Sequence, residues 1–127
     1  MKKFTLLIAM AFATLSIAQT TIKIVEIDAD QTSTDDMEFL EIRTASSSQS
    51  LDGYIVVFYN GSDNESYRTV DLSGYSSDAN GYFIIGSDLF PGADIILGPD
   101  NTIQNGADAI AIYSAAAANF PDDTPVT

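Results

Sequence analysis

Turn-forming residues divide the chain after residue 20 into short apolar segments, and no segment keeps the 3.6-residue apolar period of an amphipathic helix. Between the turns, β-branched and aromatic residues predominate, as they do in strands. The segments expected to form strands are residues 21–28, 37–44, 51–60, 66–72, 82–85, 94–97 and 107–113. Seven short strands in one small domain predict an all-β fold, an immunoglobulin-like antiparallel β-sandwich, with a small closed barrel as the alternative.

Side-chain alternation adds detail within these segments. Ile22 and Ile24 share one face of their segment, whereas Val25 and Ile27 share the other, and this change of phase predicts either a β-bulge or partial burial on both faces. Residues 54–59 are continuously apolar or aromatic, which is typical of a central strand buried on both faces.

Two short sequence patterns do not show the side-chain alternation of a strand. The alanine run at 115–118 is too short to hold a helix alone, so we expect a loop or a single helical turn there. The tetrapeptide LDGY at 51–54 recurs as LSGY at 72–75. Because the residues around the two copies do not repeat, the echo does not indicate an internal duplication.

The first 18 residues have the layout of a secretory signal peptide. Lys2 and Lys3 precede a mostly apolar stretch at 4–17, and Ser16-Ile17-Ala18 supplies small residues for cleavage. The apolar stretch is too short to span a bilayer, and no later segment is apolar enough to do so. We therefore expect residues 19–127 to form one exported domain, located outside the cell, on its surface or in the periplasm.

The charge and composition narrow the classes of function. The formal net charge is −13, and removal of the leader with its two lysines makes it two units more negative. Such a surface repels phosphate backbones and anionic membranes, so nucleic-acid binding through this domain alone is not expected. The chain contains no His, Cys or Trp. A disulfide framework is thereby excluded, and most hydrolytic and redox chemistry is disfavoured, which predicts that the domain is not an enzyme.

An acidic stretch after the first expected strand is the clearest candidate site. Its carboxylate residues are Asp28, Asp30, Asp35, Asp36 and Glu38. Carboxylate oxygens on a flexible loop are ligands that Ca²⁺ prefers. A hairpin of the first two strands would also bring Glu26 near Glu38, a like-charge pair that a cation would relieve.

The acidic stretch does not match the sequence pattern of an EF-hand calcium-binding loop. Counted from Asp28, the sixth position is Ser33 rather than glycine, and the twelfth is Phe39 rather than glutamate. A solvated acidic loop without a bound ion is therefore the alternative to a calcium site.

Five motifs, taken in their order and spacing, carry a family resemblance. They are IVEID at 24–28, EFLEI at 38–42, LDGY at 51–54, GYFIIG at 81–86 and QNGADA at 104–109. Together they resemble lamin-tail domains, especially those of exported bacterial proteins, over residues 22–113. The resemblance implies an immunoglobulin-like sandwich that serves as an interaction or accessory module. In bacteria such domains often precede secreted nucleases or phosphatase-like hydrolases.

The chain departs from that family at its end. The family usually continues with another strand where this sequence stops, at residues 120–127. We expect either a fragment of a longer protein or a sandwich closed differently, and a missing strand would leave an unpaired edge.

These observations predict a non-catalytic, exported interaction or accessory module with an unidentified protein or cell-surface partner. One alternative is an accessory domain of a secreted endonuclease, exonuclease or phosphatase-type hydrolase, whose catalytic part lies beyond residue 127. The other alternative is a calcium-dependent adhesion module.

Overall fold

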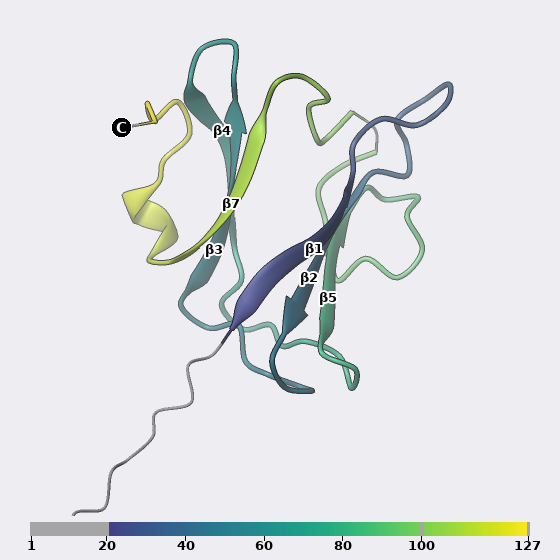
Figure 1. The fold of residues 1–127 in the computed structure, drawn as a ribbon, viewed down its shortest axis with the longest axis vertical. Helices are drawn as coiled ribbons and strands as arrows, with labels where there is room; N and C mark the ends of the chain where they lie inside the picture. The colour runs from purple at the N-terminus through teal and green to yellow at the C-terminus, as the bar shows by residue number, and fades with distance from the viewer. Residues whose placement is uncertain (1–20, 100, 127) are drawn as a thin grey trace, which may run out of the picture.

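A computed structural model describes residues 21–99 and 101–126, so the expected signal peptide at 1–18 lies outside the described residues. The described chain is a nearly all-β sandwich of two facing sheets, as the sequence predicts (Figure 1). Its strands are β1 (Ile22–Asp28), β2 (Phe39–Thr44), β3 (Tyr54–Asn60), β4 (Glu65–Asp71), β5 (Tyr82–Gly86), β6 (Ile95–Ile96) and β7 (Ala109–Ser114).

The strands form two separate sheets rather than a closed barrel. One sheet has the order β1-β2-β5-β6, and the other has the order β4-β3-β7. All pairings are antiparallel except the short parallel pairing of β5 with β6. In Figure 1 the two sheets face each other as two layers, and the apolar side chains between them form the core.

The core draws on alternate positions of the strands, as expected for a sandwich. Its buried members come from both sheets and from the connecting loops: Leu40, Ile42, Leu51, Val56, Phe58, Leu72, Phe83, Ile85 and Ile103. Ile110 and Ile112 of β7 pack against this cluster, whereas Ala109 is exposed. Ile110 and Ile112 therefore face the core from β7.

The predicted β-bulge is present in β1. The register between β1 and β2 shifts between Ile24 and Glu26, so Val25 has no partner. After the shift, Ile27 lies opposite the buried Leu40, on the same face as Ile24 opposite Ile42. By register the bulge places Ile24 and Ile27 on one face, but only Ile24 packs against the core, and Ile27 is 46 % exposed, as Val25 is at 41 %.

Strand β3 is buried on both faces because a third element covers the outside of its sheet. Val56 and Phe58 belong to the core, while Ile55 and Val57 point the other way and are equally buried. Residues 115–126, which we name the C-terminal strap, run along this outer side (Figure 1). The strap contains one short 3₁₀ helix, η1 (Ala117–Asn119), in agreement with the single turn expected from the alanine run.

The C-terminal strap is fastened by ring stacking and by backbone bonds. The ring of Phe120 stacks on Tyr113, with 4.7 Å between centroids. Ser66 N–H donates to the carbonyl of Thr124 (2.9 Å), and Asp123 N–H donates to the carbonyl of Ser66 (2.7 Å). These bonds cover the beginning of β4, which is an edge strand of its sheet.

The echoed tetrapeptides form two turns that bond to each other. Leu51 N–H donates to the carbonyl of Tyr75, and Leu72 N–H donates to the carbonyl of Tyr54. In each turn the glycine has a positive φ, +76° at Gly53 and +87° at the equivalent glycine, as a type II turn requires. The repeated sequence therefore reflects two equivalent turns with buried leucines, not a duplicated domain.

Candidate functional site

Three loops meet at one end of the sandwich, and we name this region the loop end. They are the acidic loop at 29–38, the β3–β4 turn at 60–64 and the loop at 101–108 that leads into β7. Each of the three contributes polar groups to hydrogen bonds with another, so the loop end is built by contacts between segments far apart in the sequence.

The carboxylate of Glu38 makes the central hydrogen bonds of the loop end. Its side chain is fully buried just before β2. One carboxylate oxygen accepts hydrogen bonds from the backbone N–H and the hydroxyl of Thr102, and the other accepts from the N–H of Ile103 (3.1 Å). A buried carboxylate needs such partners, because an unsatisfied one carries a large desolvation cost. Glu38 therefore holds the loop at 101–108 against the first sheet.

Asp35 and Tyr67 fasten the same loop at two further points. The carboxylate of Asp35 accepts from the side-chain amide of Asn105 (3.2 Å), and its carbonyl accepts from the N–H of Asn101 (2.9 Å). From the other sheet, the hydroxyl of Tyr67 accepts from the N–H of Gln104 (3.2 Å). Burial raises the pKa of the Tyr67 hydroxyl. The loop is thus bonded to both sheets of the sandwich.

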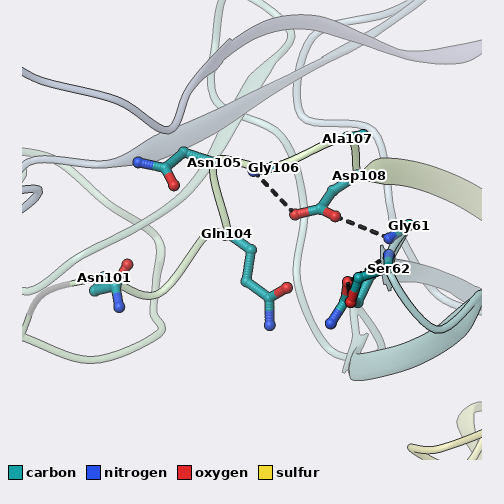
Figure 2. Close-up of a pocket in the computed structure, with 9 residues that line it drawn as sticks. Gly61, Ser62, Asn101, Gln104, Asn105, Gly106, Ala107 and Asp108 are labelled. Atoms are coloured by element: carbon teal, nitrogen blue, oxygen red, sulfur yellow. Dashed lines mark hydrogen bonds between the residues drawn. The ribbon is translucent and has the colours of Figure 1, made fainter.

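Asp108 joins the loop to the β3–β4 turn (Figure 2). Its two oxygens accept hydrogen bonds from the N–H of Gly61 (2.9 Å) and of Gly106 (3.3 Å). Gly61 packs so closely that a Cβ atom placed there would lie 1.8 Å from the carbonyl oxygen of Ala107. Only glycine fits at this contact.

An open surface pocket of about 550 Å³ lies between these loops (Figure 2). Its lining is dominated by amides and glycines, with one hydroxyl: Asn60, Gly61, Ser62, Asn101, Gln104, Asn105, Gly106, Ala107 and Asp108. Figure 2 draws no hydrogen bond from the side chains of Asn101 and Gln104 to the other lining residues. These amides are placed to donate and accept hydrogen bonds with a ligand surface.

The pocket offers little for catalysis. Asp108 is its one titratable lining residue, and both oxygens of that carboxylate already accept backbone N–H groups. General acid–base or nucleophilic chemistry needs a group free to exchange a proton or to attack.

The carboxylates predicted as calcium ligands are distributed along the loop end. Glu38 is buried and Asp35 is bonded to the opposite loop, while Asp30 is exposed. Asp28 ends β1, and the carbonyl of Asp36 accepts from the hydroxyl of a buried serine. Within residues 21–99 and 101–126, no three acidic side chains lie close enough together to hold a metal ion. The calcium site stays a prediction from the sequence.

The expected approach of Glu26 to Glu38 is wrong. The register of β1 with β2 places Glu26 opposite Glu41 instead, and the carboxylate of Glu38 is bonded to Thr102 and Ile103. This like-charge pair is on the outer face of the sheet, where water screens it.

Tyr59, Tyr113 and Tyr82 each make a defined side-chain contact. The hydroxyl of Tyr59 donates to that of Tyr113 (3.1 Å) beside the C-terminal strap. Burial and this hydrogen bond raise the pKa of Tyr59 to about 12. Tyr82 lies under the guanidinium of Arg43, which is 5.1 Å from the ring centroid.

No family model, curated protein or solved structure matches this chain in comparisons with known proteins. In the part of the chain that the structure describes, no helix is long and apolar enough to cross a bilayer.

Proposed function

We propose that the chain is an exported, non-catalytic interaction or accessory module of lamin-tail type, belonging to a surface or secreted protein. The proposal combines the signal-peptide pattern at 1–18 with the geometry of the loop end. The motifs that carry the family resemblance fall on β1, β2, β5 and two loops of the sandwich, which is consistent with the proposed type.

The observation that carries the proposal is the set of hydrogen bonds that holds the loop end in place. Glu38, Asp35 and Tyr67 hold the loop at 101–108 from both sheets, while uncharged amides face outward around the pocket. Loops held by a rigid scaffold are where binding residues commonly lie. A surface that is already ordered loses less conformational freedom on binding.

Site-specific photocrosslinking in an exporting bacterium tests this function. A photoreactive side chain at Gln104 places the probe in the loop end, and one at Ser73 places it in an exposed turn outside that region. We expect a discrete, reproducible adduct from position 104 and none from position 73. The proposal fails if position 104 gives no adduct, or if both positions give the same adducts.

A hydrolase assay of the purified chain addresses the catalytic alternative. We expect no turnover of DNA, RNA or phosphate esters above a buffer control, because the one hydroxyl lining the loop-end pocket, that of Ser62, donates to the amide oxygen of Asn60 rather than to a base. Turnover that follows the purified protein through successive columns would contradict the non-catalytic assignment.

A further inference from the structure

Four strands form the outer edges of the two sheets, and three of them are protected. Proteins protect edges with charges, bulges, short strands or a covering segment, because an unpaired edge attracts other strands. Strand β1 carries Lys23, Glu26 and Asp28 together with the bulge at Val25. Strand β6 has only two residues, and the C-terminal strap covers the beginning of β4 at Ser66.

Strand β7 has none of these protections. Its sequence AIAIYS contains no charge, proline or glycine, and its register with β3 is unbroken. Among the described residues, β3 is its one strand partner. Within residues 21–99 and 101–126, no strand pairs with the edge of β7 away from β3, although β1 of the facing sheet lies near it.

The backbone phase of β7 identifies which groups face that free edge. Ala115 N–H donates to the carbonyl of Gly53, and backbone direction alternates along an antiparallel pair. Ala109, Ala111 and Tyr113 thus point their backbone groups toward β3. The N–H and C=O groups at the alternate positions face outward, and these positions are Ile110, Ile112 and Ser114.

An acidic pocket lies at the beginning of this edge. Its volume is about 410 Å³, and Ala109 and Ile110 of β7 form part of its wall. Asp28, Asp30 and Asp108 also line it. A strand added antiparallel to β7 would begin beside Ser114 and end at this pocket.

We propose that the free edge of β7 accepts an extended peptide by antiparallel strand addition. The peptide carries uncharged β-branched residues along positions 110–114 and lysine or arginine at its C-terminal end, in the acidic pocket. Main-chain hydrogen bonds supply affinity, and the carboxylates select the direction of the peptide. The inference rests on the proposed function, because it names a class of partner for the interaction module.

A second copy of the chain fits this edge less well. In an antiparallel pairing of two β7 strands, the residues after Ser114 of one copy would reach the acidic pocket of the other. Those residues are AAAANF at 115–120, which supply no cation. The charge at the pocket therefore favours a basic peptide as the occupant.

Amide hydrogen exchange with a synthetic peptide tests the proposal directly. The probe is an N-acetylated, C-amidated peptide, TVTVTKK, and the matched control is the reversed sequence KKTVTVT. We expect saturating TVTVTKK to slow exchange at Ile110, Ile112 and Ser114 by about tenfold or more. Ala111 and Tyr113 should change little, because β3 already occupies their amides. Unchanged exchange at the three outward amides, or equal slowing by KKTVTVT, overturns the proposal.

Variants separate the backbone edge from the acidic pocket. Ser114→Pro removes one outward N–H and should weaken peptide binding about tenfold, whereas Ser114→Ala keeps that N–H and should bind normally. Replacing both Asp28 and Asp30 with asparagine should weaken binding about three- to tenfold. Equal binding by Ser114→Pro and Ser114→Ala would contradict strand addition.

Gln104 lines both pockets, so the exchange of the outward amides of β7 is what distinguishes this inference from the proposed function. If the peptide leaves β7 unchanged while crosslinks from Gln104 persist, the interaction module stands and strand addition is wrong. If the crosslinks fail and the peptide still protects β7, the binding surface is the strand edge rather than the loop end.

Discussion

Replacing Glu38 with glutamine tests whether this buried carboxylate holds the loop end together. The two carboxylate oxygens accept three hydrogen bonds from Thr102 and Ile103. An amide has one oxygen, so its NH₂ group must face at least one of these donors. In the least costly orientation, the N–H of Ile103 is left buried without an acceptor, which costs about 1–3 kcal/mol. The two remaining bonds also lose their ionic assistance, and we expect a total loss of about 2–4 kcal/mol.

Urea unfolding followed by tyrosine fluorescence measures this loss as a lower transition midpoint at unchanged slope. The matched control is Glu41→Gln, since Glu41 lies opposite Glu26 on the outer face. Removal of that like-charge pair should leave stability within about 0.5 kcal/mol of the wild type, or raise it slightly. The reasoning is refuted if Glu38→Gln is as stable as Glu41→Gln.

Three further predictions concern the turn, the strap and the acidic loop. Gly61→Ala should lower the free energy of unfolding in urea by about 3 kcal/mol, because its Cβ would overlap the carbonyl of Ala107. The control Ser62→Ala should stay within about 0.5 kcal/mol of the wild type. Equal stability of the two variants would contradict the close contact. The pKa of Tyr59 is raised from 10.0 to about 12, so its stabilisation is fully present below pH 10 and is lost as the pH rises toward 12. Between pH 10 and pH 12, the melting temperature should therefore fall less steeply with pH for Tyr59→Phe than for the wild type. An equal fall in both proteins would show that the hydroxyl has no such effect. Millimolar Ca²⁺ should leave the melting temperature unchanged, since Glu38 already accepts three hydrogen bonds; stabilisation near 2.7 kcal/mol, the value for a ligand at a hundredfold of its dissociation constant, would instead support the calcium site.

Local sequence predicted most of the strands, because the pattern of apolar and polar side chains that marks a strand lies within each segment. The phase change between Ile24 and Val25 predicted a bulge or burial on both faces, and the structure has the bulge, with Ile27 opposite Leu40. The continuous run at 54–59 likewise predicted burial on both faces of β3.

The fastening of the loop end was not predictable from local sequence. Glu38 has its partners 64 and 65 residues away, and nothing around it distinguishes a buried acceptor from a surface carboxylate. Its place in an acidic stretch instead suggested a cation ligand. The exclusion of a Cβ at Gly61 depends in the same way on a distant backbone, at Ala107.

The position of the C-terminal strap was likewise not predictable from local sequence. Residues 120–126 contain two prolines and no alternation, so they predict no strand. They nevertheless bond to Ser66 and cover an edge, because the outer face of β3 and β7 is apolar enough to bind Phe120.

Native-state amide exchange at Thr102, Ile103 and Gly61 tests the fastened loop end most directly. All three N–H groups lie in loops, yet each donates to a carboxylate, of Glu38 or of Asp108. We predict that Thr102 and Ile103 exchange as slowly as amides in the central strand β3, and that Gly61 exchanges more slowly than its exposed neighbours. Exchange of all three at the rate of unstructured peptides would contradict a loop end ordered by its own carboxylates.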